Sequence, residues 1–384
     1  MARQQKKKRQ TRYFDYSLLF IIIFLICFGL VMLYSTSAYD AQITFKGDAM
    51  HYLKRQGFAF GLGLVGMFFI TFIDYRIWKK FGLLAYIVAM GLCTLVLIPG
   101  IGIEHNNSRR WLGIPNTAFE FQPSEFAKLA LIVFLSCLIC KVPRKMAKFS
   151  TIIKILVCFV LPIFGLIAYN NLSTALIVLG ISVAMLFVAS PKYGQFFMVG
   201  GVGILGAALF LVLPSAGYRS ERIQMWFHPE EFEKGYQTLQ GLYAIGSGGL
   251  FGKGLGNSMQ KLGFVPEAPN DMIFSIICEE LGLFGAVCVI MLFLLLLWRF
   301  MVIANNARDL FGSLLVTGIM AHIAIQVILN IAVVTNTIPN TGVTLPFFSY
   351  GGTSVVFLMA EMGLALSVSR GIVFEPEVSE NGYD

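Results

Sequence analysis

The chain has 384 residues, of which 57% are hydrophobic and 13% charged, and its formal net charge is +8. Soluble domains carry about a quarter charged residues, so this composition excludes a soluble protein. The basic residues near the N-terminus form a short tail without interleaved aromatic residues, which gives no support for nucleic-acid binding. We expect the charge to reflect membrane topology and attraction to anionic lipid head groups.

Ten apolar stretches, most of them about 17–25 residues long, have the length that a bilayer-crossing helix needs. They lie at 16–35, 57–73, 81–100, 123–140, 151–169, 174–190, 196–213, 273–298, 311–335 and 347–368. The first stretch is too long for the apolar region of a secretory signal, so we interpret it as an uncleaved helix. The sequence therefore predicts an all-α polytopic membrane protein with about ten transmembrane helices.

A basic tail at 1–15 and an acidic, flexible tail at 371–384 frame a single transmembrane domain at 16–370. Basic residues concentrate in the cytoplasmic loops of membrane proteins. If the first tail is cytoplasmic, most of the 29 Lys and Arg residues fall on its side of the membrane. An even number of helices then places both termini in the cytoplasm. The segments that face outward are 36–56, 101–122, 214–271 and 336–346, and the largest connects helices seven and eight.

The first chemically suggestive residues in chain order are Arg109 and Arg110, which precede Trp111 in the outward segment 101–122. Arginine binds phosphate through two parallel hydrogen bonds, and tryptophan anchors proteins at the membrane interface. The spacing leaves two interpretations open, a clamp for a diphosphate and an ordinary interfacial anchor.

The fourth predicted helix opens with residues 122–128 (QPSEFAK). Glu125 and Lys128 are three apart and share a helix face, and as an ion pair they enter a bilayer at much lower cost than either alone. The pair is either a structural ion pair or the charged wall of a substrate cavity. Glu279 and Glu280 in the eighth helix and Glu361 in the tenth should likewise pair across helices or line a polar cavity.

The large outward loop has two parts. Residues 218–240 mix aromatic, basic and acidic side chains, which suits short helices at the membrane interface. Residues 246–256 (GSGGLFGKGLG) are rich in glycine but lack the Lys-Ser/Thr pair of a phosphate-binding loop. A sharply turning loop and a phosphate contact both remain open for this part.

Metal and thiol chemistry have little support. All seven cysteines fall within predicted helices, where small packing residues are expected. The four histidines are scattered, so we expect no protein-encoded zinc site.

Asp271 ends the polar loop at 263–271, and membrane-like sequence follows at once. A carboxylate in this position is costly to bury unpaired, and partial desolvation tunes it toward a general base. The alternative is an aspartate that caps the eighth helix. Further along, prolines, glycines and hydroxyl residues interrupt the apolar sequence at 338–354, which includes Ser349. Broken backbone at membrane depth requires protein or a water-filled cavity around it, so we expect a polar cavity that opens outward here.

Three separated motifs resemble the SEDS family (shape, elongation, division and sporulation). They are QPSEFAK at 122–128, the run from GLGNS at 254–258 to PEAPND at 266–271, and LPFFSYGG at 345–352. The resemblance covers residues 13–372. The segments 109–111 and 261–264 are more similar to the division and sporulation branches than to the elongation branch.

The resemblance implies a peptidoglycan glycosyltransferase that polymerises lipid II into a lipid-linked glycan at the outer face of the bacterial cytoplasmic membrane. It implies that Asp271 is the catalytic residue and that Glu125 and Lys128 line the cavity beneath it, with Gln122 and Ser349 as supporting residues. It also implies a class B penicillin-binding protein and other division proteins as partners, at the division septum. Two departures from the family pattern are Asn170-Asn171, where an acidic motif is common, and Pro269, where a histidine is common.

Forming a β-1,4 bond from an α-linked diphosphate inverts the anomeric carbon, which needs a base for the incoming hydroxyl and stabilisation of the leaving group. We take Asp271 as the base and Arg109, Arg110 and Lys261 as outward cations for the diphosphate. No cofactor is encoded, but Mg²⁺ or Mn²⁺ held with the substrate phosphates is compatible with the sequence. The rival hypotheses are a lipid II flippase and a non-catalytic division scaffold.

Overall fold

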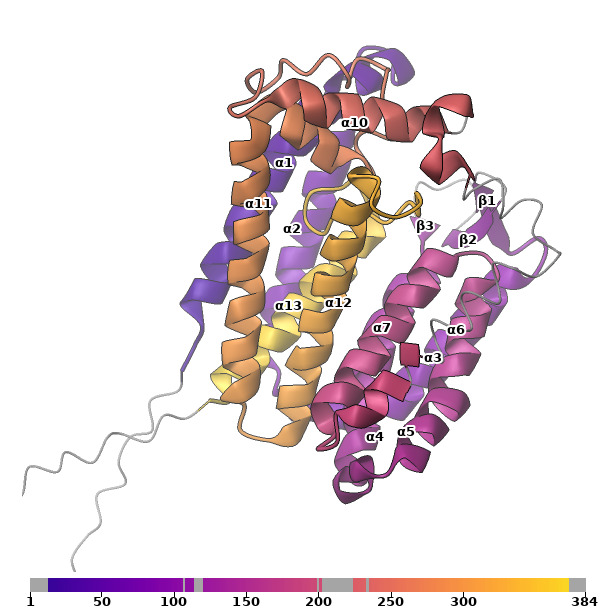
Figure 1. The fold of residues 1–384 in the computed structure, drawn as a ribbon. Coiled ribbons are helices and arrows are strands. Elements are labelled where there is room, and N and C mark those ends of the chain that lie inside the picture. Colours follow the sequence, from indigo (N-terminus) through magenta and orange to yellow (C-terminus); the bar gives the residue numbers. More distant parts are fainter. Residues whose placement is uncertain are drawn as a thin grey trace, which may run out of the picture.

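The computed structural model describes residues 13–105, 108–113, 120–198, 200–201, 224–232 and 235–372. Within these residues, nine helices are long and apolar enough to cross a membrane (Figure 1). They are α1 (Tyr16–Thr44), α2 (His51–Phe72), α3 with the short turn before it (Tyr75–Leu97), α4 (Pro123–Lys141), the span of α5 and α6 (Phe149–Ala168), α7 (Leu172–Ala189), α11 (Ile273–Asn305), α12 (Leu310–Val334) and α13 (Gly352–Arg370). The prediction of a polytopic helical protein is confirmed. Most of the seventh predicted helix, 196–213, and most of both tails lie outside the described residues.

The first two helices extend beyond the apolar stretches that predicted them. α1 continues to Thr44 and α2 begins at His51, so most of the predicted outward segment 36–56 is helical. A helix satisfies its own main-chain groups on both sides of the membrane surface. Hydropathy therefore predicts the part of each helix that lies in the lipid, but it does not predict where the helix ends outside the membrane.

A small antiparallel sheet, which the sequence did not predict, lies between α3 and α4 in this otherwise helical protein. Its strands are β1 (Gly102–His105), β2 (Ser108–Gly113) and β3 (Glu120–Phe121), in the order β1-β2-β3. The chain turns closely over the end of α3 at Gly102, where a Cβ would lie 2.2 Å from the carbonyl oxygen of Val96. Strands this short leave too little alternation in the sequence to be recognised.

The fifth span is a helix with a local change of register. α5 (Phe149–Ile155) and α6 (Leu161–Ala168) are joined by a π-helical turn at Leu156–Val160. Pro162 in the first turn of α6 has no N–H to donate, which favours such a turn. The hydroxyl of Tyr86 on α3 donates to the carbonyl of Phe159 at 2.8 Å and so binds a main-chain oxygen within the turn.

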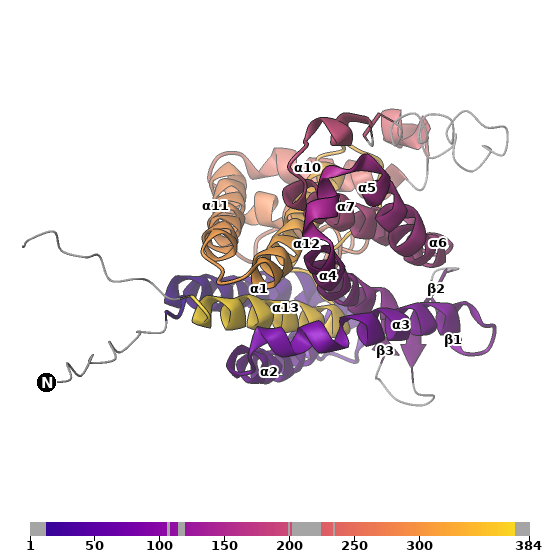
Figure 2. The ribbon, with the colours of Figure 1, turned by 90° about the horizontal axis from the view of Figure 1, so that it is seen from below.

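The buried centre of the bundle is formed by α4, α12 and α13. α12 packs against α4, α7, α11 and α13, and α13 packs along α2. Seen from below, α12 and α4 lie between α11 on one side and α5, α6 and α7 on the other (Figure 2). Large apolar side chains on the outer helices, such as Phe58, Phe68 and Leu83, stay exposed as lipid-facing residues do.

The glycine-rich loop fills a break in α11. Gly282 inside this helix has φ 68° and ψ −166°, which interrupts the helical hydrogen bonding. Four main-chain hydrogen bonds to the loop replace the bonds that the break removes. The N–H groups of Lys253 and Gly254 donate to the carbonyls of Glu279 and Glu280 (3.0 and 2.9 Å), and those of Leu283 and Phe284 donate to the carbonyls of Gly249 and Leu250 (2.9 and 3.1 Å).

This close contact explains the glycines. A Cβ on Gly252 would lie 2.1 Å from the carbonyl oxygen of Glu280, and one on Gly248 would lie 2.0 Å from that of Cys278. Of the two interpretations of the loop, the structure supports the sharp turn, because its N–H groups at 253 and 254 already bind α11. The helix before the loop, α10 (Tyr236–Gly248), lies across the end of the bundle (Figure 1).

The two ends of the described chain meet at the end of the bundle opposite α10. The N–H of Tyr13 donates to the carbonyl of Ile372 at 3.4 Å. Arg299 on α11 pairs with Asp15 there, at 2.6 Å. This agrees with termini on one side of the membrane, and the assignment of that side to the cytoplasm stays a prediction.

Candidate active site

Asp271 is buried beneath α10, immediately before α11. The residue is 7% exposed, and Nε2 of Gln237 on α10 donates to both carboxylate oxygens at 3.3 and 3.4 Å. The N-cap of α11 is Met272, without a side-chain hydrogen bond, so Asp271 does not cap the helix. Burial and then the nearby carboxylate of Glu267 raise the pKa of Asp271 to about 7. A carboxylate with this pKa is a stronger base than an ordinary aspartate and is still available at neutral pH.

The main chain around Asp271 is tied to two other parts of the protein. Nδ2 of Asn330 on α12 donates to the carbonyl of Asp271 at 2.8 Å. Two residues earlier, the carbonyl of Pro269 accepts a hydrogen bond from the N–H of Tyr350 at 2.9 Å. A Cβ on Gly342 would lie 3.8 Å from Oδ2 of Asp271. The interrupted segment 338–354 therefore lies against the carboxylate.

Glu125 and Lys128 form the ion pair that their spacing predicts. Nζ of Lys128 lies 2.9 Å from Oε1 of Glu125, with the Lys128 and Glu125 side chains 2% and 13% exposed, respectively. The ammonium also donates to Oε1 of Gln326 on α12 at 3.3 Å. Glu125 lines a small cavity with Gln326 and Ser349. The pair thus combines both interpretations, a buried ion pair whose acidic member lines a cavity.

Polar residues four apart on α12 connect these parts. His322, Gln326 and Asn330 share one helix face. Nδ1 of His322 lies 2.8 Å from the carboxylate of Glu361 on α13, and its Nε2 lies 2.9 Å from Oε1 of Gln326. The expectation that Glu361 pairs across helices is confirmed. This polar stripe was not predicted, although its four-residue spacing inside an apolar helix is visible in the sequence.

Ser349 supports the interrupted segment. Its hydroxyl accepts a hydrogen bond from the N–H of Leu345 at 2.8 Å, and its carbonyl accepts one from Nε2 of Gln56 on α2 at 3.1 Å. Phe347 between them has φ 69°, an uncommon conformation for a residue with a side chain. These bonds hold the wall of the cavity.

Arg109 and Arg110 line a second cavity of about 30 Å³, together with Gln122, Asn170 and Asn171. Nε of Arg110 donates to the carbonyl of Asn170 at 2.9 Å, and Nδ2 of Asn170 donates to the carbonyl of Arg109 at 2.7 Å. The structure therefore places Gln122 with the arginines, whereas Glu125 and Ser349 line the other cavity. Asn170, where the chain departs from the SEDS pattern, holds strand β2.

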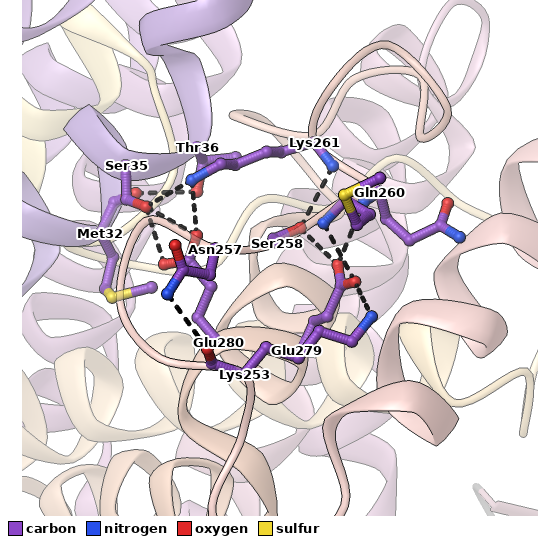
Figure 3. Close-up of polar contacts among 11 residues, drawn as sticks. Met32, Ser35, Thr36, Lys253, Asn257, Ser258, Gln260, Lys261, Glu279 and Glu280 are labelled. Carbon is purple, nitrogen blue, oxygen red and sulfur yellow. Dashed lines mark hydrogen bonds and ion pairs between the residues drawn. The ribbon is translucent and has the colours of Figure 1, made fainter.

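The expectation that Lys261 is an outward cation is wrong. Its ammonium lies 2.7 Å from Oε1 of Glu280 and donates to the hydroxyl of Ser35 on α1 at 3.0 Å, and its side chain is 8% exposed. Figure 3 shows the three side chains pointing toward one another. Glu280 is fully buried, and a buried carboxylate needs a positive charge to neutralise it. Lys261 supplies that charge, so its ammonium is already engaged in an ion pair.

Glu279 is neutralised in the same region. Nζ of Lys253 lies 2.6 Å from its carboxylate, and the hydroxyl of Ser258 donates to it as well (Figure 3). The N–H groups of Met259 and Gln260 add two further hydrogen bonds, at 3.2 and 3.3 Å. Both carboxylates are paired, but their lysine partners come from the loop before α11 and not from another helix, and these pairs fix the loop that leads to Asp271.

In the part of the chain that the structure describes, no three His, Cys, Asp or Glu side chains are grouped closely enough to hold a metal ion. A divalent cation held with a substrate diphosphate therefore stays a prediction.

Comparison with known sequences gives a consistent assignment. The family model FtsW/RodA/SpoVE, described as cell cycle protein, matches residues 16–372. Stage V sporulation protein E of Bacillus subtilis is 42% identical over 359 residues, which cover 93% of this chain and 97% of the relative. The probable peptidoglycan glycosyltransferase FtsW of Trichlorobacter lovleyi is 37% identical over 374 residues, which cover 97% of each chain.

Two solved structures share the fold. The crystal structure of the rod shape determining protein RodA of Thermus thermophilus aligns with a TM-score of 0.67 at 28% identity, covering 93% of this chain and 97% of RodA. A chain in a structure described as the structural coordination of polymerization and crosslinking by a peptidoglycan synthase complex aligns with a TM-score of 0.77 at 27% identity. That alignment covers 93% of this chain and 98% of the other.

Proposed function

The chain belongs to the FtsW, RodA and SpoVE family of cell cycle proteins, and we propose that it polymerises lipid II at the outer face of the cytoplasmic membrane with Asp271 as the general base. It is a multi-pass membrane protein and a peptidoglycan glycosyltransferase, the activity named for its FtsW relatives. Identities of 42% and 37% to SpoVE and FtsW relatives confirm the predicted likeness to the sporulation and division branches.

The observation that carries the proposal is the environment of Asp271. Its carboxylate is buried, faces the interrupted segment at Gly342, and has its pKa raised to about 7. In the step we propose, the carboxylate takes the proton of the 4-hydroxyl of one sugar. The hydroxyl oxygen then bonds to the anomeric carbon of the other sugar as the bond from that carbon to the diphosphate oxygen breaks. One displacement of this kind inverts the anomeric carbon.

Other groups at the site have supporting parts in this proposal. Glu125 lines a cavity beside the interrupted segment, Lys128 neutralises Glu125, and Gln237 orients the carboxylate of Asp271. Arg109 and Arg110, on strand β2, bind the diphosphate in this proposal, supported by the fit of a guanidinium group to phosphate oxygens. A Mg²⁺ or Mn²⁺ ion held by the same phosphates would add charge stabilisation, and restoration of activity by either ion after chelation would test it.

A class B penicillin-binding protein is the partner we propose, at the division septum. The similar solved chain belongs to a peptidoglycan synthase complex whose description joins polymerization with crosslinking. A crosslinking partner supplies the second of those activities. Co-purification of the two proteins, and a change in strand synthesis on adding the partner, would test this assignment.

The rival functions are a lipid II flippase and a division scaffold, and one assay separates the three. Purified protein is reconstituted in vesicles with labelled lipid II, and both glycan strands and exchange between leaflets are measured. We expect strands from the wild-type protein and none from Asp271→Asn that remains folded. Leaflet exchange without strands would indicate a flippase, and neither signal would indicate a scaffold.

The proposed diphosphate contact has its own test. Arg109→Glu and Arg110→Glu should weaken lipid II binding because each replaces a positive charge with a negative one beside the phosphates. Arg308→Glu is the matched control, since Arg308 lies in the connection between α11 and α12 at the opposite end of the bundle. If all three variants bind lipid II equally well, the diphosphate contact is wrong and the arginines are ordinary anchors at the membrane interface.

A further inference from the structure

Asn330 is a fully buried amide on α12 that joins two segments far apart in the sequence. Its Nδ2 donates to the carbonyl of Asp271 at 2.8 Å and to the carbonyl of Val343 at 2.7 Å. The amide therefore holds both the end of the polar loop at 263–271 and the interrupted segment. An apolar side chain of similar size would fill the same space without holding either carbonyl.

The residue one turn earlier on α12 holds the next carbonyl along the same segment. Nε2 of Gln326 donates to the carbonyl of Thr344 at 3.0 Å, and its Oε1 accepts from Lys128. Two side-chain amides four residues apart on α12 thus bind the carbonyls of two consecutive residues, 343 and 344. Through Gln326 and Asn330, α12 therefore contacts Lys128, the interrupted segment and the main chain of Asp271, and fixes their relative positions.

Two amides act on Asp271 in different ways. Gln237 contacts the carboxylate itself, from α10. Asn330 contacts only the main chain, so its effect on the reaction is indirect. We propose that Asn330 is a positioning residue for glycosyl transfer, which fixes the Asp271 main chain against residue 343 and so sets where the carboxylate meets the attacking hydroxyl. This inference rests on the proposed role of Asp271 as the base.

The geometry predicts a specific kinetic change when the amide is lost. A general base must lie within hydrogen-bonding reach of the proton that it takes, and a misplacement of about 1 Å costs about 100-fold in rate. Without Asn330 the loop and residue 343 lose their common tie, and water gains access to Asp271. Greater hydration favours the ionised carboxylate and lowers its pKa. The rate should then fall, and its dependence on pH should move to lower pH.

The test compares Asn330→Ala, Asn330→Ser and Thr317→Val in the purified full-length protein with lipid II. Thr317 is a matched control, because it is buried on the same helix and its hydroxyl donates within that helix to Ser313 at 2.8 Å. We expect Asn330→Ala to lower kcat by about 10- to 100-fold with a much smaller change in KM. We expect the pH of half-maximal rate to fall below that of the wild-type protein, and Thr317→Val to match the wild type in both.

Asn330→Ser keeps one donor in a smaller side chain and should lie between the wild type and Asn330→Ala. If Asn330→Ala does not fold, the kcat and pH profile of Asn330→Ser decide the matter. An unchanged kcat and pH profile in the folded variant, with only the melting temperature lowered, would overturn the inference and leave Asn330 a purely structural amide. An Asp271→Asn variant assayed in parallel separates failure of the proposed function from failure of the positioning role. Activity in that variant overturns the proposed function, whereas its inactivity beside a fully active Asn330 variant overturns only the positioning role.

Discussion

Replacing Asp271 by asparagine should stabilise the protein above neutral pH while it abolishes strand synthesis. The pKa of Asp271 is raised from 3.8 to about 7 in the folded protein, first by burial and then by Glu267. An acid whose folded pKa lies above its unfolded value destabilises the fold as pH rises through the interval between them. Each pKa unit is worth about 1.36 kcal/mol, so the raised pKa of Asp271 lowers the free energy of unfolding by about 4 kcal/mol above pH 7. Below pH 4 the carboxyl is neutral in the folded protein, and this loss of stability almost disappears.

The assay is the apparent melting temperature of detergent-solubilised wild type and Asp271→Asn, at one scan rate, at pH 5 and pH 8. At pH 8 the variant should melt several degrees higher, because a neutral amide replaces a buried charge. At pH 5 the wild-type carboxyl is mostly neutral, and the difference should shrink. The same comparison in a Glu267→Gln background is a second test. Removing the charge of Glu267 should reduce the difference in melting temperature between Asp271 and its asparagine replacement at pH 8. An equal difference at both pH values would refute the reasoning, and so would a variant that melts lower at pH 8.

Two further predictions concern the groups around the site. Gly252→Ala should destabilise the protein by about 2–5 kcal/mol, because φ is +76° and the new Cβ would lie 2.1 Å from the carbonyl oxygen of Glu280. Gly256→Ala, with φ +84° and open space around it, should cost only about 1–2 kcal/mol, and equal melting temperatures would contradict the proposed contact with α11. Glu125→Gln should cost about 3–5 kcal/mol because it leaves the ammonium of Lys128 buried without its carboxylate. Adding Lys128→Met should recover much of that loss in a double-mutant cycle, and strictly additive effects would show that the pair is not coupled.

The helices and the central charges could be predicted because their signals are local. Apolar length alone predicts the nine long helices of the described residues, and the three-residue spacing of Glu125 and Lys128 is enough to put both on one helix face. Asp271 was identified from a carboxylate beside membrane-like sequence, together with the family motif. The structure adds its burial, its contact with Gln237 and the absence of a capping role.

What could not be predicted depends on contacts between distant segments. The pairing of Lys261 with Glu280 and Ser35 brings together a loop and two helices, and nothing in the loop sequence reveals that its lysine turns inward. The break at Gly282 is likewise visible only when the loop at 249–254 is seen to complete its hydrogen bonds. Asn330 carries no charge and lies in an apolar helix, so its sequence position does not reveal the two distant carbonyls that its amide binds.

The central claim is that a buried Asp271 acts as the base. Its most direct test is the pH dependence of strand synthesis at saturating lipid II, in the wild-type protein and in Asp271→Asn. With the pKa of Asp271 raised to about 7, the wild-type rate should rise with pH through about 7 and then level off, since only the ionised carboxylate accepts the proton. Asp271→Asn should form no strands at any pH. A wild-type rate that is flat from about pH 5 to pH 9, or strands made by the folded variant, would contradict the account.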